Sequence, residues 1–395
     1  MTDAIATARH VRDAVATDLD LLLGDLARWV GHESPSGAQA HLDALAAEIA
    51  QTLSGYGLAC ELVPSVAGLH VHAALEGGGR ARVALLCHHD TVFALGTVAR
   101  RPLRSEGDRL IGPGVADMKG GLAVAAHAAR VLAGGERPFA RLELVSVPDE
   151  EIRSEPIATQ ARLAGFDAVL CMECGRPGGA VVAARKGGRW LDVVTRGRSA
   201  HAGSEPQHGR NAVLALAREL PRIAALDGAR EGLTLHVTRM QGGDVLNSIP
   251  SEARATIDMR GWHEADLDWA ENQLLRIDPH RGVTFTTEER LATPPLERTA
   301  AVAALAAQAA VLGEALGSAV PETSTGGVSD GCWTAGAGLP TLDGLGPVGA
   351  LDHSPDEYIE LSSLAHRCGL VAGLVAAVDA GLPGAENPPQ AGLPR

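Results

Sequence analysis

The sequence is short of positive charge for its length. Its 395 residues include 34 Lys and Arg but 48 Asp and Glu, so the formal net charge is −14. Nucleic acids and anionic membranes bind proteins mainly through clustered basic side chains. The composition therefore predicts that the partner is neither a nucleic acid nor a membrane.

The sequence also lacks long apolar runs. Residues 1–30 carry Asp and Arg side chains throughout an amphipathic helical pattern, and no uninterrupted apolar run of 18 residues occurs elsewhere. Export signals and transmembrane helices depend on such runs. We therefore expect a cytoplasmic protein.

Cysteine is scarce, with six residues in the chain. Cys171 and Cys174 have the C-x-x-C spacing of thiolate metal sites and redox pairs, but such sites usually need a second pair or a thioredoxin-like context. The sequence contains neither of these. We therefore expect Cys87, Cys171 and Cys174 to be small buried residues in a protein from a reducing compartment.

Acidic and imidazole side chains stand where three short apolar segments end. They are His88 after 83–87, Glu150 and Glu151 after 142–147, and Glu173 after 167–172. The segments read as buried strands, and open α/β sheets bind ligands at the carboxyl ends of their strands. Nitrogen and oxygen ligands of these types suit divalent cations such as zinc.

Two further candidates lie outside these strands. Asp117 stands in the Gly-rich segment 111–121, just before an Ala-rich helix predicted over 122–133, and His353 follows much later in the chain. A single Asp or His is more often a solvated surface group or a helix cap than a metal ligand. The joint pattern nevertheless indicates a hydrolase centre in which two cations share a carboxylate.

The motifs resemble those of a known enzyme family. The runs are C-H-H-D-T-V (87–92), I-G-P-G-V-A-D-M-K-G-G (111–121), P-D-E-E-I (148–152), C-M-E (171–173), S-A-H-A-G (199–203) and D-H-S (352–354). In this order, and over almost the whole chain, they are similar to the motifs of the di-zinc metallopeptidase family. That family includes glutamate carboxypeptidases, acetylornithine deacetylase, succinyl-diaminopimelate desuccinylase and aminoacylases.

The resemblance implies a reaction and a substrate class. The chain would be a metal-dependent hydrolase that cleaves an amide bond next to a free carboxylate, by attack of a metal-bridged water. Its substrate would be a small N-acyl amino acid or peptide, and the closest similarity is to glutamate carboxypeptidases. Two zinc ions per subunit are implied, and Co²⁺ or Mn²⁺ suits the same ligands.

The resemblance also implies roles at the metal centre. His88, Asp117 and Glu173 would hold one zinc ion, while Asp117, Glu151 and His353 would hold the other. Glu150 would be the general base. Asp90 would accept the other ring N–H of His88 and fix its tautomer. The Asp117–Met118 peptide bond would be cis.

Adjacent histidines leave a question of register. On a strand end only one of His88 and His89 can face the metals, because successive side chains point to opposite faces. The match to the family motif favours His88. His89 is then expected to be a packing or pocket residue.

Other matched positions concern the substrate. His201 would stabilise the oxyanion, and in dimeric relatives this histidine comes from the partner's inserted domain. Asn247 and Arg260 match positions that grip the free carboxylate. Gly327 lies in the segment 325–331, whose backbone N–H groups could form an anion nest. A turn histidine, a turn asparagine and a surface arginine are the alternatives.

Length and element order predict two domains of an α/β protein. The predicted elements after residue 178 have the ferredoxin-like order βαββαβ. They are strand 189–196, helix 209–226, strands 233–240 and 251–260, helix 263–276 and strand 282–288. We therefore expect a doubly wound zinc-peptidase catalytic domain (1–178 and 290–395) with an inserted domain (179–289) that acts as a lid and forms a homodimer.

Three other interpretations stay open. A deacylase of the acetylornithine deacetylase or succinyl-diaminopimelate desuccinylase type would use the same metal centre. A catalytically inactive, metal-binding relative is disfavoured by the presence of Glu150 together with all five ligands. A nucleotide-binding doubly wound protein is disfavoured because no G-x-G-x-x-G or G-x-x-x-x-G-K-[ST] run follows a strand.

Overall fold

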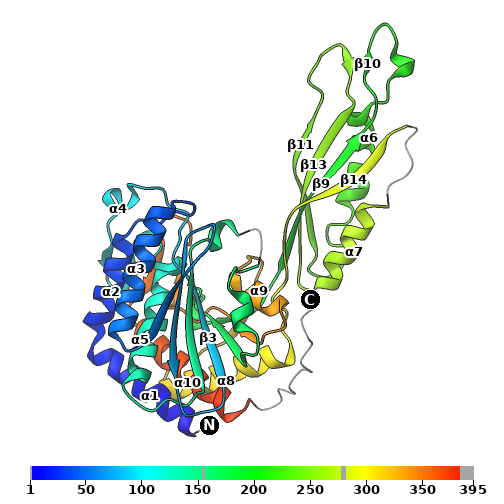
Figure 1. Ribbon diagram of the computed structural model, residues 1–395. Helices are drawn as coiled ribbons and strands as arrows, with labels where there is room; N and C mark the ends of the chain where they lie inside the picture. The colour runs from blue at the N-terminus through cyan, green and yellow to red at the C-terminus, as the bar shows by residue number, and fades with distance from the viewer. Residues whose placement is uncertain (1, 154–155, 277–281, 383–395) are drawn as a thin grey trace. The chain divides into compact units, whose positions relative to one another are not determined.

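The computed structural model describes residues 2–153, 156–276 and 282–382, which form two compact units (Figure 1). Unit 1 consists of Met1–Ala184, Arg298–Ser324 and Ser329–Arg395, and unit 2 of Arg185–Glu297 and Thr325–Val328. The second unit is thus inserted into the first. The expected boundary at 289/290 falls inside strand β14 (Thr284–Thr293), which continues to pair with its neighbour as far as Thr293.

The sheet of unit 1 places three parallel strands side by side. The strand order is β1 (Ala59–Pro64), β2 (Leu69–Glu76), β6 (Arg141–Val147), β3 (Arg82–His88), β7 (Ala168–Cys171) and β16 (Thr341–Leu342). Strand β3 pairs in parallel with both β6 and β7, whereas β2 pairs antiparallel with both β6 and β1. The carboxyl ends of β6, β3 and β7 therefore meet at one edge of a mixed sheet. These three strands are almost wholly buried, as expected for strands covered on both faces.

Helices pack around this sheet (Figure 1). The longer ones are α1 (Thr2–Thr17), α2 (Leu19–Gly31), α3 (Gln39–Gly55), α5 (Gly120–Ala133), α8 (Ala300–Leu316) and α10 (Ser363–Ala380). Helix α10 is long and apolar enough to cross a membrane, but 78% of it is buried inside unit 1. It packs against α1, α5 and α8. These contacts are those of a core helix.

Short elements complete unit 1. A small sheet has the order β17 (Gly349–Ala350), β18 (Tyr358–Glu360), β5 (Arg109–Ile111) and β4 (Arg104–Glu106). Strand β8 (Val181–Arg185) pairs with β15 (Glu322–Thr325). The short helices are α4 (Thr97–Arg100) and α9 (Asp330–Gly336).

Unit 2 is a four-stranded antiparallel sheet with two helices. The strand order is β11 (Thr234–Gly242), β13 (Glu252–Gly261), β9 (Gly187–Arg196) and β14. With α6 (Ala212–Ala224) after β9 and α7 (Glu264–Leu274) after β13, the chain order is the predicted βαββαβ. Buried and more exposed residues alternate along β13, because one face of the sheet packs against the helices.

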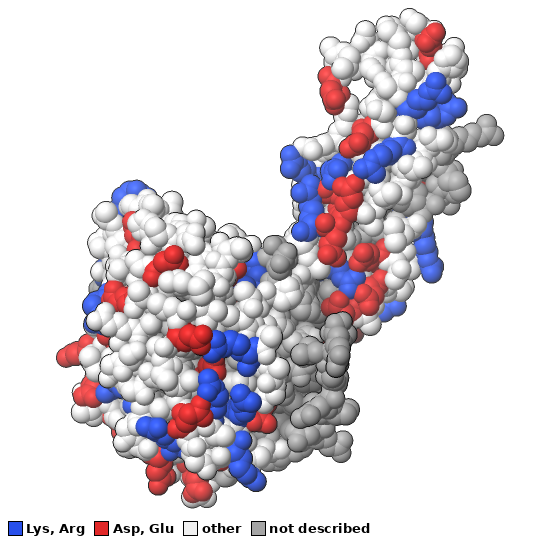
Figure 2. Space-filling model, in the orientation of Figure 1, with Lys and Arg blue, Asp and Glu red and all other residues white. Residues whose placement is uncertain are grey.

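The other face of this sheet carries ion pairs. Asp192 lies 2.5 Å from both Arg254 and Arg290. Figure 2 shows acidic and basic side chains intermixed over the visible side of unit 2. A small ribbon of β10 (Ala200–His201) and β12 (Ser248–Ile249) lies beside the main sheet.

Candidate metal centre

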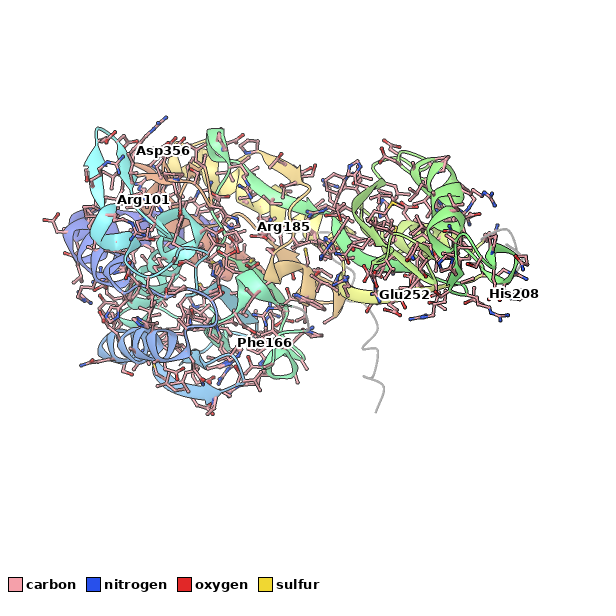
Figure 3. The ribbon with its side chains drawn as sticks, turned by 90° about the horizontal axis from the view of Figure 1, so that it is seen from above. Arg101, Phe166, Arg185, His208, Glu252 and Asp356 are labelled. Atoms are coloured by element: carbon pink, nitrogen blue, oxygen red, sulfur yellow. The ribbon has the colours of Figure 1, made fainter. Side chains whose placement is uncertain are left out.

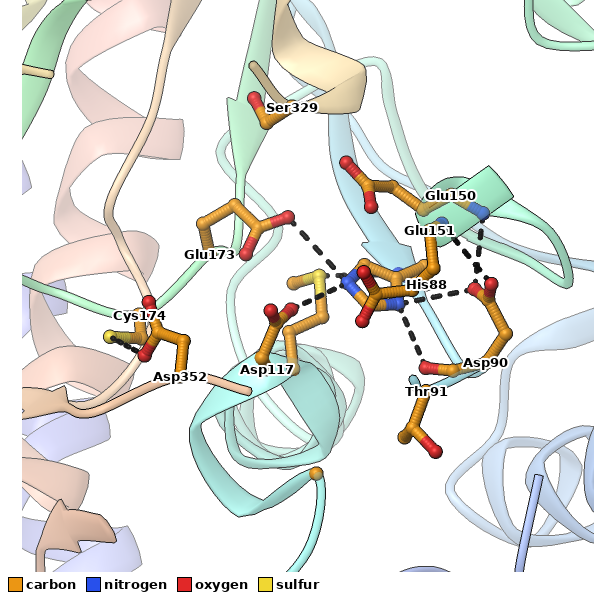
Figure 4. Close-up of polar contacts among 12 residues, drawn as sticks. His88, Asp90, Thr91, Asp117, Glu150, Glu151, Glu173, Cys174, Ser329 and Asp352 are labelled. Atoms are coloured by element: carbon orange, nitrogen blue, oxygen red, sulfur yellow. Dashed lines mark hydrogen bonds and ion pairs between the residues drawn. The ribbon is translucent and has the colours of Figure 1, made fainter. Parts of the chain in front are cut away.

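The strand order of unit 1 explains why distant ligands converge. His88 is the last residue of β3, while Glu150 and Glu151 follow β6 and Glu173 follows β7. Since these strands are neighbours and parallel, their carboxyl ends bring the four side chains to one place (Figure 4).

Asp117 reaches the same place through close backbone packing. It lies in a distorted turn before α5, follows Gly114 with φ of 72°, and is joined to Met118 by a cis peptide bond, as the resemblance implied. At Gly121, a Cβ atom would lie 1.8 Å from the carbonyl oxygen of Met172. Only glycine permits this approach of the helix start to the end of β7.

Asp117 is shared by two groups of potential ligands. Its Oδ1 lies 2.9 Å from His88 Nε2, which is 3.7 Å from Glu173 Oε1. Its Oδ2 lies 3.1 Å from His353 Nε2, which is 3.2 Å from Glu151 Oε2. Within each group, all candidate ligand atoms lie within 4.8 Å of one another.

His353 occupies a loop between β17 and β18 with a backbone φ of 62°. This left-handed conformation is uncommon outside glycine and is concentrated at functional sites. It presents the imidazole to Asp117 and Glu151.

The residues present fit divalent cations. Glu151 Oε1 is buried and has no hydrogen-bond partner among the described residues. Burial, followed by the negative charge of Asp117, raises the pKa of Glu151 to about 7. Burial, together with the charges of Asp330 and Glu173, raises the pKa of Glu150 well above its usual value. Repelling carboxylates beside two imidazoles form a donor set that a cation would neutralise.

Asp90 connects the two sides of the centre. Its Oδ1 lies 3.2 Å from His88 Nδ1, and its carbonyl oxygen lies 3.1 Å from the same nitrogen. The carboxylate also accepts the backbone N–H groups of Glu150 and Glu151 at 3.1 and 3.2 Å. One buried side chain thus orients the candidate ligand His88 and the turn that carries Glu150 and the candidate ligand Glu151.

His89 points away from this group of residues. It is fully buried, and its Nδ1 lies 2.9 Å from Ser146 Oγ. Burial lowers the pKa of His89 to about 3. Cys87, Cys171 and Cys174 are also buried.

Sequence reasoning missed Glu357, which supports the Asp117 turn. This buried carboxylate accepts the backbone N–H groups of Gly114, Ala116 and Asp117 at 3.1, 2.8 and 3.0 Å. Burial raises its pKa to about 8. A single acidic residue four positions after His353 offered no separate signal.

A buried ion cluster beside Glu150 was also missed. Arg153 Nε lies 2.5 Å from Asp330 Oδ1, and its Nη2 lies 2.8 Å from Asp149 Oδ1. The side chains of Arg153 and Asp330 are each 4% exposed. The i,i+4 spacing of Asp149 and Arg153 is visible in the sequence, but the pairing with Asp330 is not.

The matched residues of unit 2 fall into two groups. His201 and Asn247 lie together, since Ala202 N–H donates to the Asn247 carbonyl at 2.8 Å. His201 is exposed, and its Nδ1 accepts the backbone N–H groups of Gly203 and Ser204 at 3.1 and 3.0 Å.

Arg260 and Gly327 form the second group. Arg260 donates to the Gly326 carbonyl at 3.0 Å and stacks on Trp190, and the Gly327 carbonyl accepts from Arg185 at 3.2 Å. The N–H of Gly331, expected in an anion nest, instead donates to Ser329 Oγ at 3.2 Å.

The two groups lie at different ends of unit 2. Asn247 follows β11, whose last residue Gly242 pairs with Ala253, while Arg260 pairs with Gly188 at the other end of β13. Eight residues of extended strand, about 26 Å, separate Glu252 from Arg260. In Figure 3, His208 labels the end of unit 2 that carries His201 and Asn247, and Arg185 labels the end that carries Arg260 and Gly327. Asn247 and Arg260 of one chain therefore lie near opposite ends of β13.

Comparisons with known proteins agree with the fold and with the family that the sequence motifs predicted. Residues 84–377 match the model of peptidase family M20/M25/M40. The chain is 30% identical over 327 residues to carboxypeptidase G2 from Pseudomonas sp. strain RS-16, covering 80% of this chain and 78% of that protein. It is 29% identical over 322 residues to acetylornithine deacetylase from Myxococcus xanthus, covering 76% and 81%.

A solved structure shows the same fold. Aminopeptidase PepT from Bacillus cereus superposes with a TM-score of 0.72 at 19% identity, covering 90% of this chain and 98% of that chain. The extent of the family match, together with the identity to carboxypeptidase G2, establishes the family. The chain therefore belongs to peptidase family M20/M25/M40 and is a metal-dependent hydrolase.

Proposed function

We propose that the protein is a di-zinc hydrolase that cleaves an amide bond next to a free carboxylate, in the manner of a glutamate carboxypeptidase. The observation that carries this proposal is the sharing of Asp117 between His88 and His353. The similarity to carboxypeptidase G2 over 80% of the chain supports the substrate class.

His88, Asp117 and Glu173 would hold one cation, and Asp117, Glu151 and His353 the other. Cations bound there would supply Lewis acidity and bring the pKa of a water molecule to about 7. Zinc fits the nitrogen and oxygen donors, and Co²⁺ or Mn²⁺ would fit them as well.

Glu150 would move the proton. It adjoins Glu151 but does not belong to either ligand group. Its backbone N–H is held by Asp90 at 3.1 Å, which keeps Glu150 next to the candidate ligands. Glu150 would take a proton from the attacking water and deliver it to the nitrogen of the leaving amine.

The two groups in unit 2 suggest how a homodimer would contribute. His201 would donate a hydrogen bond to the oxyanion, with Asn247 beside it, while Arg260 and the Gly327 segment would face the substrate carboxylate. Since about 26 Å of strand separates the groups, one copy of unit 2 could present only one of them to a given substrate. The second group would then come from the partner subunit.

A deacylase is the second candidate, because the chain is also similar to acetylornithine deacetylase over 76% of its length. The metal-binding residues do not distinguish a carboxypeptidase from a deacylase, because both enzymes hydrolyse an amide bond. For either reaction we propose a cytoplasmic enzyme.

A substrate panel tests the proposal. Purified, zinc-loaded protein would be assayed with peptidyl-glutamate, N-acetyl and N-succinyl amino acids. We expect hydrolysis of peptidyl-glutamate, with a kcat loss of about 10²–10⁴-fold in Glu150→Gln at unchanged zinc content. Preference for N-acetylornithine would favour the deacylase. Unchanged turnover in Glu150→Gln would contradict the role of the base.

A further inference from the structure

Unit 1 contains a cavity whose lining includes none of the candidate metal ligands. Its volume is about 350 Å³, and it lies between the end of α8, the Gly178–Gly179 turn and the first two turns of α10. Pockets that hold small organic molecules begin at about 300 Å³. The cavity therefore has room for a ligand of several heavy atoms.

Arg367 gives this cavity its charge. The residue is 3% exposed and lines the cavity wall. Its guanidinium donates to the carbonyls of Gly179 at 2.9 Å and Gly344 at 3.4 Å. Among the described residues, no carboxylate is recorded within ion-pair distance of it. Burying a cation without an anionic partner is costly, and within the described part of the chain only two of its five N–H donors have an acceptor.

The other residues that line the cavity determine which kind of anion fits it. Leu316, Val320, Val348 and Leu370 line it with apolar side chains, and Glu360 is the acidic residue among the lining residues. A single buried guanidinium near one carboxylate suits a monoanion better than a phosphate dianion. The apolar walls suit a hydrocarbon body.

The start of α10 does not supply the anion site. The backbone N–H and hydroxyl groups of Ser362 already donate to Asp108 at 2.9 and 2.6 Å. Ser363 Oγ donates to the Glu360 carbonyl at 2.6 Å and accepts the Val348 N–H at 3.0 Å. Arg367 and the half-buried His366 are then the lining side chains that can present a positive charge to an anion, and Arg367 is the buried one of the two.

We propose that this cavity binds a small organic monocarboxylate, with its carboxylate on Arg367 and its apolar part against Leu316, Val320 and Leu370. The carboxylate can belong to a free acid or to an amino acid, whose ammonium group would lie toward Glu360. The proposal concerns binding outside the metal centre and is independent of which amide the enzyme cleaves.

Calorimetric titration of the zinc-loaded protein tests this site with three probes: 4-methylpentanoate, leucine and inorganic phosphate. We expect saturable binding of 4-methylpentanoate and weaker or no binding of phosphate. Tighter binding of leucine would identify an amino acid as the occupant, and weaker binding of leucine would identify a free acid. Phosphate binding tighter than either carboxylate would overturn the proposal, as would the absence of saturable binding.

Matched variants separate this cavity from the metal centre, which also attracts carboxylates. Ala319 lines the cavity and is exposed, so Ala319→Phe should fill the cavity while leaving Arg367 and the zinc ligands in place. We expect Ala319→Phe and Arg367→Met to weaken 4-methylpentanoate binding at least tenfold. Arg298→Met, which removes a half-exposed arginine outside the lining, should change nothing. Unchanged binding in Ala319→Phe would place the ligand elsewhere and refute the site even if Arg367→Met fails to fold.

Discussion

The two carboxylate oxygens of Asp117 face different histidines, since Oδ1 lies 2.9 Å from His88 Nε2 and Oδ2 lies 3.1 Å from His353 Nε2. Because one side chain belongs to both ligand groups, its loss should affect two cations. Asp117→Ala should retain neither ion after dialysis, whereas Glu173→Gln should retain about one. Elemental analysis of the dialysed proteins measures this. The exposed neighbour of His353 gives a control, Asp356→Asn, which should keep the wild-type metal content. Two ions retained in Asp117→Ala would refute the shared ligand.

Arg153 should hold the turn of Glu150 through its buried pair with Asp330. Removing one partner of a buried ion pair typically costs about 3–5 kcal/mol, so Arg153→Met should lower the free energy of unfolding by that order. The double variant Arg153→Met/Asp330→Leu should recover part of this loss, because two apolar side chains need no charge partner. Urea unfolding measures both variants.

Turnover should not recover fully with stability in that double variant, because Asp149 loses its partner Arg153 and Asp90 alone then holds the Glu150 turn. We expect kcat to stay reduced while KM changes little. Arg162→Met, which removes a more exposed arginine, serves as the control. Recovery of kcat to the wild-type value would show that Arg153 acts on stability alone.

Glu357 should control metal affinity without contacting the cations. Its two oxygens accept three backbone N–H groups of the Asp117 turn, whereas glutamine would place an NH₂ group against at least one of them. Outer residues that orient ligands typically contribute 10–100-fold in affinity, so Glu357→Gln should weaken zinc binding by about that factor. Competition with a zinc chelator measures this, with the exposed Glu136→Gln as control. Equal zinc affinities of Glu357→Gln and the wild-type protein would show that Glu357 stabilises the fold but does not influence metal binding.

His70 should make stability depend on pH. It is fully buried, and neither ring nitrogen has a hydrogen-bond partner among the described residues. Burial, followed by the nearby charge of Arg153, lowers its pKa from 6.5 to about 4. Between these values the unfolded chain binds a proton that the folded chain does not, so the stability present above pH 6.5 is lost as the pH falls toward 4.

The variant His70→Phe should remove this contribution, which amounts to about 1.4 kcal/mol per pH unit within that window. Urea unfolding at several pH values between 5 and 8 compares it with wild type. We expect a shallower acid dependence and nearly unchanged stability at pH 8. The same slope in both proteins would mean that His70 is protonated in the fold.

The spacing of apolar residues along the sequence predicted the strands and helices that position the site. The apolar segments before His88, Glu150 and Glu173 became adjacent parallel strands, and carboxyl ends of such strands share an edge. The order of elements in unit 2 was also confirmed. In both cases the spacing of apolar residues distinguishes strands from helices.

Pairings over long separations were not predictable. Arg153 and Asp330 are 177 positions apart. Nothing in the sequence around either residue distinguishes it from an ordinary charged residue on the surface. Strand β2 pairs antiparallel with both β1 and β6 and so makes the sheet mixed, which the apolar segments alone do not reveal. The separation of Asn247 from Arg260 follows from strand register, which a family motif does not encode.

The position of His353 in the chain has a consequence for biosynthesis. The other candidate ligands all lie before residue 174, and His353 follows after a further 113 residues of Arg185–Glu297 that fold into a separate body. All three ligands of the first group are therefore synthesised long before the second group is complete, yet the Asp117 turn that both groups share is held by Glu357, which is made after His353. A product truncated before residue 353 would lack both His353 and the carboxylate that supports Asp117, so it should bind neither cation with full affinity.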